Sequence, residues 1–192
     1  MEITEPWPFR WNLKDYYRLC HEEWFLGRRV QLIGGEIWEF GPSHDWHDAS
    51  VTLMGDELRK AFGTGYWVRV KGSLDVSDRS VPDPDLAVIV GSPRQYRTQG
   101  NPETALLVVE VSEATLWFDR NPKANLYASA NVADYWIVNL VQRQLEVYRD
   151  PLPDSSQLFG FRYNSRTILD PPDKVSPLAA PHASITVADL LP

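Results

Sequence analysis

Two stretches of this sequence, DLAVIV at residues 85–90 and ALLVVEV at residues 105–111, are nearly uninterrupted apolar runs. Runs of this length are typical of strands buried on both faces, because a strand with one face in water alternates apolar and polar residues. Strands of this kind lie in sheets that helices cover on both sides. The two stretches therefore predict the centre of an α/β sheet.

Further helices and strands are predicted on both sides of this centre. The predicted helices span 12–23, 43–62 and 121–130, with caps at Asn12, Ser43 and Asn121. The predicted strands span 30–33, 36–40, 66–70, 74–76, 134–139, 144–148 and 158–163, and a polar loop spans 91–103. The strand–helix–strand order between residues 106 and 138 indicates a mixed sheet with helices packed on it.

Two local patterns refine this prediction. Gly34-Gly35 between two strand-like segments is a signal for a two-residue hairpin turn. In the first helix, the spacing of Leu13, Tyr16, Tyr17 and Cys20 predicts that these four side chains share one face. An N-terminal helix and a hairpin are therefore expected before the central sheet.

The composition is that of an ordinary globular protein, with 43% hydrophobic and 23% charged residues in a chain of 192. We expect one domain over 1–192, with a core over 12–150 and a proline-rich extension over 151–192. No apolar run approaches the roughly 18 residues that a membrane span needs, and the N-terminus lacks the pattern of a signal peptide. The expected location is the cytoplasm.

The net charge is −7, from 26 acidic and 19 basic residues. Domains that coat nucleic acid by neutralising its phosphates are usually basic, so the charge argues against a protein of that class. An enzyme that meets phosphates only locally is still compatible with it. The charge alone leaves an ordinary acidic protein and such an enzyme equally open.

Two carboxylates interrupt the apolar runs. Glu110 lies near the end of the second run, where an unpaired buried charge would cost several kcal/mol. Asp85 opens the first run, after prolines that hold its approach extended; Asp83 is the alternative at this position. If the two strands are adjacent, Asp85 and Glu110 meet and repel each other unless a cation or a proton lies between them.

The ligand chemistry of these residues favours a hard divalent cation. Carboxylate oxygens suit Mg²⁺ or Mn²⁺, and Cys20 is the only cysteine, so a cysteine-built zinc site is excluded. His44 and His47 form a His-x-x-His pair, but no thiol or suitably spaced third histidine supports zinc there. The predicted metal site therefore consists of Asp85 and Glu110.

Lys123 is a second unusual residue. If Asn121 caps its helix, Lys123 lies in the first turn, where the helix dipole disfavours a cation. A carboxylate pair or a phosphate nearby would compensate, and Tyr127 shares the helix face of Lys123. Phosphodiester hydrolysis needs a metal to polarise the phosphoryl oxygen and benefits from a second cation. Asp85, Glu110 and Lys123 together fit that reaction.

The chain resembles the Uma-two family, which consists of bacterial proteins, abundant in cyanobacteria, that are described as candidate restriction endonucleases. The resemblance covers about residues 12–150. The matching segments are Gly35-Glu36-Ile37, Ser43 to His47, Pro84 to Val88, Leu107 to Ser112, Asp119-Arg120 with Lys123 and Tyr127, and Asp134 to Val138. No single segment is specific, but their joint occurrence in this order is.

The resemblance implies a restriction-endonuclease-like core of the PD-(D/E)XK superfamily, with a mixed central sheet flanked by helices. It implies Asp85 and Glu110 as ligands of Mg²⁺ or Mn²⁺, with the carbonyl of Val111 as a third ligand. Superfamily members usually place the lysine two residues after the acidic residue, which is Ser112 here, so this sequence departs from that pattern. In the Uma-two family the lysine is on the following helix instead, and the resemblance therefore assigns the role to Lys123.

The resemblance also adds Glu36 and His47 to the site and implies DNA as the substrate. A homodimer follows only by analogy with nucleases that cut two strands with two subunits. The leading hypothesis is a metal-dependent endonuclease acting on DNA.

Two other hypotheses are compatible with the same residues. The first is a catalytically inactive binding or assembly module on the nuclease fold, which the displaced lysine and the acidic charge would favour. The second is a structural ion cluster of the carboxylates and Lys123 in a protein with an unrelated role. Removing one member of such a cluster should destabilise the fold by about 3–5 kcal/mol.

Overall fold

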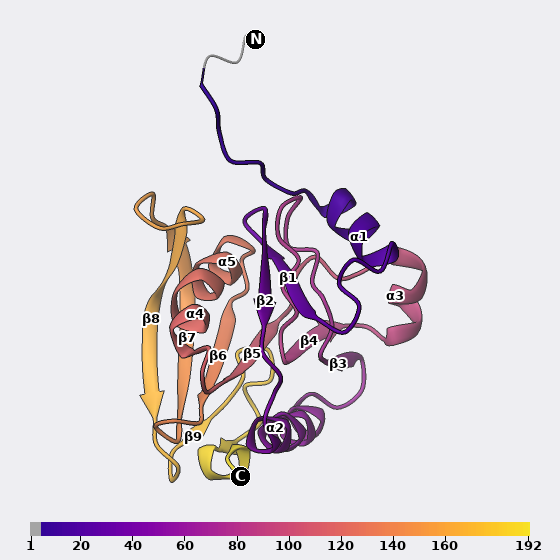
Figure 1. The fold of residues 1–192 in the computed structure, drawn as a ribbon. Coiled ribbons are helices and arrows are strands. Elements are labelled where there is room, and N and C mark those ends of the chain that lie inside the picture. Colours follow the sequence, from indigo (N-terminus) through magenta and orange to yellow (C-terminus); the bar gives the residue numbers. More distant parts are fainter. Residues whose placement is uncertain (1–4) are drawn as a thin grey trace.

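The computed structural model describes residues 5–192 and contains a six-stranded mixed sheet in the order β3-β4-β5-β6-β7-β8 (Figure 1). Its strands are β3 (Tyr66–Val70), β4 (Leu86–Val90), β5 (Leu107–Ser112), β6 (Asp134–Asn139), β7 (Gln144–Pro153) and β8 (Phe161–Leu169). β5 and β6 are parallel, and the other neighbouring pairs are antiparallel. The predicted mixed α/β sheet is confirmed, with both apolar runs at its centre.

Helices cover both faces of this sheet, because the central strands are apolar on both sides. On one face, α2 (Asp45–Phe62) packs Met54 and Leu58 against a cluster that includes Val109. On the other face, α5 (Ala124–Ser129) packs Tyr127 against a cluster that includes Val108. Neighbouring residues of β5 therefore point to opposite layers, as the pleat of a strand requires.

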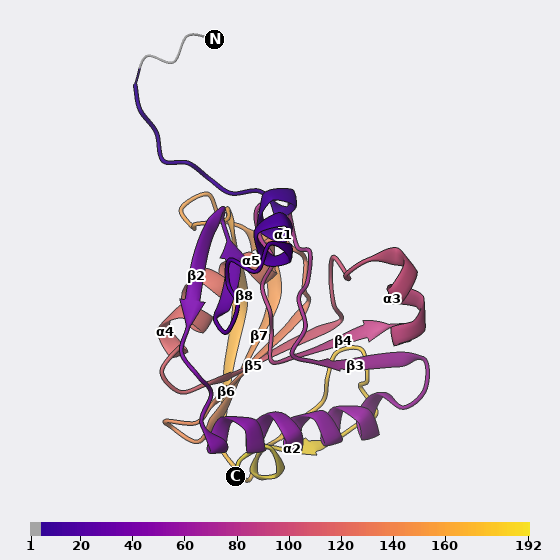
Figure 2. The same ribbon diagram turned by 45° about the vertical axis from the view of Figure 1, so that its right-hand side comes forward.

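The C-terminal residues lie beside α2. They form β9 (Lys174–Val175), β10 (Ile185–Thr186) and the short 3₁₀ helix η2 (Val187–Leu190). Figure 2 shows this yellow segment next to α2, and the Ser50 hydroxyl donates a 2.6 Å hydrogen bond to the carbonyl of Leu190. The strand predicted over 158–163 lies further along the chain than expected: β8 begins at Phe161 and continues to Leu169.

The N-terminal helix and hairpin form as predicted. They are α1 (Leu13–His21), β1 (Arg29–Ile33) and β2 (Glu36–Phe40). Asn12 caps α1 by accepting a hydrogen bond from the backbone N–H of Asp15. Gly34 and Gly35 both have positive φ, which the turn between β1 and β2 requires. The predicted apolar face of α1 is partly wrong, since Leu19 is buried and Cys20 is exposed.

Three further local predictions are wrong. Residues 74–76 form no strand. The predicted loop over 91–103 contains α3 (Pro93–Gln99), which Ser92 and Gln95 start with a capping box. The cap of α2 is His44 rather than Ser43. The capping box and Pro93 in the first turn are local signals for α3, which has no buried residue.

The helix that carries Lys123 begins earlier than predicted. It consists of α4 (Leu116–Phe118), the π-helical turn η1 (Asp119–Lys123) and α5, so Asn121 is not its cap. Pro122 lies inside the π-helical turn, whose altered hydrogen bonding tolerates a residue without an N–H. Lys123 is therefore in the middle of a continuous helical segment and not at the positive end of its dipole.

None of the helices formed by residues 5–192 has the length and apolar character needed to cross a membrane.

Candidate active site

The pairing of β4 with β5 brings Asp85 and Glu110 together. In this antiparallel pair Leu86 is opposite Val109 and Ala87 is opposite Val108. Asp85 directly precedes Leu86 and Glu110 directly follows Val109, so the two acids continue the same register. Both lie on the face that α5 covers, because side chains alternate along each strand. The condition that the sequence left open, adjacency of the two strands, is met.

Asp85 is held by its backbone neighbour and by a histidine. Its Oδ2 accepts a 2.9 Å hydrogen bond from the N–H of Val111 and lies 3.1 Å from Nε2 of His47. Only 6% of the residue is exposed. Burial raises the pKa of Asp85, but the hydrogen bond and charge of His47 outweigh it, and the pKa lies below its usual value. Asp85 is thus an ionised carboxylate in a buried position.

Glu110 has the opposite balance. Its Oε1 accepts a 2.7 Å hydrogen bond from the Tyr127 hydroxyl and lies 2.9 Å from Nζ of Lys123. The residue is 2% exposed. Burial raises the pKa of Glu110 well above its ordinary range, although the Lys123 ammonium lowers it. The positive charge of Lys123 is therefore not enough to offset the burial of the Glu110 carboxylate, and a further cation would stabilise its ionised form.

Lys123 lies between acids and an aromatic ring. Its Nζ is 3.4 Å from Oδ1 of Asp119 in addition to its contact with Glu110, and it lies 5.3 Å from the centre of the Phe40 ring. Burial lowers the pKa of Lys123, but Glu110 and Asp119 outweigh it, so the ammonium stays charged. A negative environment around Lys123 was predicted, but it comes from these acids and not from the need to offset a helix dipole.

Asp119 is a member of this cluster that the sequence did not reveal as a site residue. Its Oδ2 accepts hydrogen bonds from the hydroxyls of Ser112 and Thr115, and its Oδ1 faces Lys123. Ser112, two residues after Glu110, thus contributes a hydroxyl where the superfamily pattern has a lysine. The available signal was the four-residue spacing between Asp119 and Lys123, which places the pair on one helix face.

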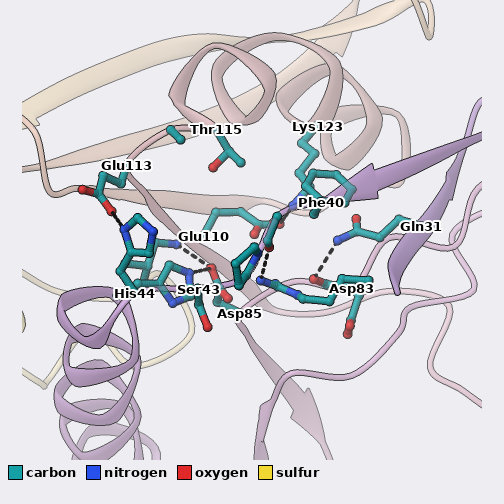
Figure 3. A pocket seen from close by; sticks show the side chains of 16 residues that line it. Gln31, Phe40, Ser43, His44, Asp83, Asp85, Glu110, Glu113, Thr115 and Lys123 are labelled. Atoms are coloured by element: carbon teal, nitrogen blue, oxygen red, sulfur yellow. Dashed lines mark hydrogen bonds and ion pairs between the residues drawn. The ribbon is translucent and has the colours of Figure 1, made fainter. Parts of the chain in front are cut away.

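These residues line one cavity of about 270 Å³ (Figure 3). Among its walls are five of the predicted site residues, namely Asp85, Glu110, Val111, Lys123 and His47. Arg29, Gln31 and Asp83 also line it, and His44 lies 3.2 Å from Glu113 at its wall.

Glu36 is the predicted site residue that the structure does not bring to this cavity. It is exposed, forms an ion pair with Arg10 and lines a separate cavity with Arg79 and Phe159. Glu36 begins β2 beside the hairpin turn, whereas Phe40 at the other end of the strand lines the cavity. Four residues of strand separate the two positions by about 13 Å. The assignment of Glu36 to the site does not agree with this geometry.

The residues of the cavity fit a hydrated divalent cation. Every protein hydrogen bond and ion pair of the two acids falls on Oδ2 of Asp85 and Oε1 of Glu110. Oδ1 of Asp85 and Oε2 of Glu110 therefore have no protein partner among residues 5–192. Within the same range, no three His, Cys, Asp or Glu side chains gather into a closed metal site. Mg²⁺ commonly uses one or two carboxylates and completes its coordination with water and substrate oxygens.

Comparisons with known proteins agree on a nuclease fold. A crystal structure of a "putative nuclease" from Anabaena variabilis superimposes with a TM-score of 0.67 and 13% sequence identity, covering 93% of this chain and 96% of that one. No curated protein matches the chain significantly. The family model described as "Putative restriction endonuclease" matches residues 13–188. This chain belongs to that family, the Uma-two family.

Proposed function

We propose that this protein is a divalent-metal-dependent endonuclease that hydrolyses phosphodiester bonds of DNA. One observation carries the proposal: buried carboxylates from two adjacent central strands, Asp85 and Glu110, line one cavity with the ammonium of Lys123. Titratable groups with strongly perturbed environments in a cavity are characteristic of active sites. The family description supports the same reaction class.

Asp85 and Glu110 would hold Mg²⁺ or Mn²⁺ through their free oxygens, and the carbonyl of Val111 is the proposed third ligand. When bound, such a metal polarises a phosphoryl oxygen and lowers the pKa of a coordinated water. The N–H of Val111 already holds Asp85, so the same strand segment would position both a carboxylate and a carbonyl.

Lys123 would stabilise the negative charge that builds up on the phosphate and orient the attacking water. Its ammonium is held at the cavity by Glu110 and Asp119, and Tyr127 fixes the carboxylate of Glu110. A fixed cation in a poorly hydrated site stabilises charge more than the same group in water. His47 has a positioning role, since it holds Oδ2 of Asp85 and leaves Oδ1 free.

Arg29 supports a nucleic acid as the substrate. It is exposed at the cavity, and its guanidinium donates a 3.0 Å hydrogen bond to the carbonyl of Gly41. It forms no ion pair with an acid of residues 5–192, so its remaining donors are open to a phosphate. A local cation of this kind compensates for the overall charge of −7 where the strand would lie.

The test is cleavage of supercoiled plasmid with Mg²⁺ or Mn²⁺. We expect the wild type to nick and linearise the plasmid, and the Asp85→Ala/Glu110→Ala protein and a chelated wild-type sample to be inactive. Asp154→Ala, which changes a half-buried acid between β7 and β8 that does not line the cavity, is the matched control and should retain full activity. Wild-type cleavage no faster than that of the double variant would refute the proposal.

The second candidate is a binding module without catalysis, and one observation favours it: the Lys123 ammonium is already engaged by two acids. This candidate predicts DNA binding that needs no metal and survives Asp85→Ala. The proposed endonuclease predicts that Mg²⁺ strengthens DNA binding and that Asp85→Ala removes this strengthening. Fluorescence anisotropy with a labelled duplex, with and without chelator, distinguishes the two.

A further inference from the structure

A cavity of about 490 Å³ lies at the turn of the β1–β2 hairpin, apart from the candidate active site. Four segments of the fold line it: the hairpin with Trp38, the turn before β4 with Arg79, α5 with Leu126 and the β7–β8 connection with Phe159. We call it the hairpin cavity. Its volume is in the range of cavities that hold small molecules, and the proposed metal site does not account for it.

The hairpin cavity carries a free positive charge. Arg79 is exposed, and its carbonyl accepts a 2.8 Å hydrogen bond from the N–H of Gly35, which ties the residue to the hairpin turn. The Arg79 guanidinium forms no hydrogen bond or ion pair within residues 5–192. Arg10 and Glu36 also line the cavity and form an ion pair with each other. Two arginines therefore face one glutamate here, which leaves one positive charge for an anion in a protein of net charge −7.

The walls beside Arg79 are aromatic and apolar. Trp38 is 39% exposed, and its ring packs on the ring of Phe118 with 4.9 Å between their centres. The ring of Phe159 lies over the hairpin turn, where a Cβ at Gly34 would be only 3.3 Å from it. A cation beside aromatic side chains suits a ligand that has an anion at one end and an aromatic ring at the other. A nucleotide is such a ligand.

β2 connects the hairpin cavity with the cavity of the candidate active site. Glu36, Trp38 and Phe40 are alternate residues, so their side chains share one face of this strand. The rings of Trp38 and Phe40 both pack on Phe118. Glu36 and Trp38 line the hairpin cavity, and Phe40 lines the other one. The about 13 Å between Glu36 and Phe40 corresponds to about four nucleotides, because a stacked strand rises about 3.4 Å per nucleotide.

The shape and chemistry of the hairpin cavity select an unpaired strand. A base inside a duplex is stacked on its neighbours and has to leave the helix before it can enter a cavity. Aromatic side chains that stack on bases, next to cations that contact the backbone, are typical of proteins that bind single strands. We propose that the hairpin cavity holds one nucleotide of an unpaired DNA strand, with its phosphate on Arg79 and its base against Trp38. This subsite rests on the proposed function in taking DNA as the substrate, and its nucleotide would lie about four positions from the phosphate that is cleaved.

Fluorescence anisotropy of a labelled decathymidylate strand tests this subsite in the full-length protein, with a chelator present so that the strand stays intact. We expect Arg79→Gln to weaken binding about fivefold to tenfold and to reduce the slope of log Kd against log salt by about 0.7, the value for one phosphate contact on a single strand. Trp38→Leu should weaken binding about tenfold and leave the slope unchanged, because it removes stacking and no charge.

Two controls accompany these variants. Arg94→Gln removes an exposed arginine on α3 that lines neither cavity, so it should leave both the affinity and the slope unchanged. With a fully paired duplex of the same length, Trp38→Leu should bind as the wild type does, because the paired bases cannot reach the cavity.

An unchanged affinity and slope in Arg79→Gln overturn the subsite, and so does a wild type that does not bind the strand. An effect of Arg79→Gln without an effect of Trp38→Leu also overturns it, because a surface charge without a place for the base would remain. If Trp38→Leu does not fold, Phe159→Leu takes its place, since Phe159 lines the same cavity.

Plasmid cleavage separates the subsite from the proposed function. Cleavage by the wild type together with strand binding that Arg79→Gln leaves unchanged overturns the subsite alone. Strand binding that depends on Arg79 and Trp38, without any cleavage, supports the subsite and contradicts the endonuclease.

Discussion

Two clusters of buried acids in this protein have opposite charge balances. Around Glu146, the carboxylate receives hydrogen bonds from Arg120, Arg166, Asn139 and Tyr148, and both of its oxygens are satisfied. In the cavity, Asp85, Glu110 and Asp119 gather around the single lysine, Lys123, with His47 on Asp85. The Glu146 cluster is complete within the protein, and the cavity cluster is short of positive charge.

The pKa values of the two glutamates follow this difference. Burial raises the pKa of Glu146, but the hydrogen bonds from Arg120 and Asn139 outweigh it, and the pKa lies below its usual value. For Glu110, burial outweighs Lys123, and the pKa lies above it. A buried acid supplied with enough donors is part of the framework, whereas one left with too few is suited to bind a cation.

The largest expected effect is on the cleavage rate, which should depend on the lysine of the cavity cluster and not on the arginine of the Glu146 cluster. Lys123 and Arg120 both belong to η1, and each pairs with a buried glutamate. We expect Lys123→Met to slow plasmid cleavage on the order of a hundredfold to a thousandfold, because a fixed cation at the reacting phosphate is lost. Arg120→Met is the matched control and should cleave at the wild-type rate.

Initial cleavage rates at saturating Mg²⁺ measure this effect, with circular dichroism at the assay temperature to verify that both variants are folded. Equal loss of activity in the two variants would contradict a catalytic role for Lys123 and would leave only a structural one.

Metal binding should stabilise the protein through the cavity cluster alone. A ligand at a hundred times its dissociation constant stabilises the folded state by about 2.7 kcal/mol. We expect Mn²⁺ to raise the melting temperature of the wild type and to have a smaller effect on Asp85→Asn. Asp134→Asn is the matched control, since Asp134 is a buried aspartate that pairs with Arg149 and does not line the cavity.

The metal-free melting temperature of Asp85→Asn tests the structural ion cluster as the rival explanation. If the two acids repel each other in the absence of metal, Asp85→Asn should be as stable as the wild type or more stable. A loss of about 3–5 kcal/mol would favour the structural cluster instead.

Glu146→Gln should cost more stability than Glu110→Gln. Hydrogen bonds to charged groups contribute about 1.5–3 kcal/mol each, and the neutral amide weakens those from Arg120 and Arg166. In Glu110→Gln, Asp119 still pairs with Lys123, and an acid that burial disfavours is removed. Urea unfolding at pH 7 measures both free energies; the reverse order would show that the two clusters do not differ as described.

The smallest expected effect is on the pH dependence of stability. The raised pKa of Glu110 contributes stability that is present below its ordinary value of 4.5 and is lost as the pH rises through the folded-state pKa. The lowered pKa of Glu146 contributes stability that is present above 4.5 and is lost as the pH falls through its folded-state pKa. No single group changes stability by more than about 1.4 kcal/mol per pH unit.

Urea unfolding between about pH 2 and pH 9 tests these opposite signs, because the Glu146 contribution changes only below about pH 4.5. Glu110→Gln should flatten the decline toward alkaline pH, and Glu146→Gln should flatten the rise out of acid. Profiles that change in the same direction in both variants would be incompatible with the opposite pKa shifts.

Much of the fold and part of the candidate site could be predicted from the sequence. The runs at 85–90 and 105–111 predicted two central strands, and the carboxylates at their ends predicted a meeting of Asp85 and Glu110 that the β4–β5 pairing produces. Asp119 was missed, although its four-residue spacing from Lys123 was a signal, because the helix was predicted to begin only at Asn121 and so left Asp119 outside it. The argument from the helix dipole was wrong for Lys123, since Asn121-Pro122 resembles a helix start and here lies inside a π-helical turn.

Gln31 shows where prediction from the sequence ends. It lies in a hairpin strand more than 50 residues before Asp83, and its isolation as an unpartnered acceptor depends on how that hairpin packs. Glu36, from the same hairpin, was assigned to the site and lies at the opposite end of its strand from the cavity. The local sequence could not predict where either residue lies relative to the cavity, because long-range contacts set the orientation of a hairpin relative to a sheet.

The sequence by itself determined the apolar central strands, the hairpin turn at Gly34-Gly35 and the acids that end the two runs. These features depend on side-chain periodicity and backbone preference, which act over a few residues. Tertiary structure alone decided the register of β4 against β5, the place of Asp119 and Gln31, and the excess of acids over cations around Lys123. Those depend on which distant segments share a low-dielectric interior, where the charge balance of the whole cluster sets the energy of each member.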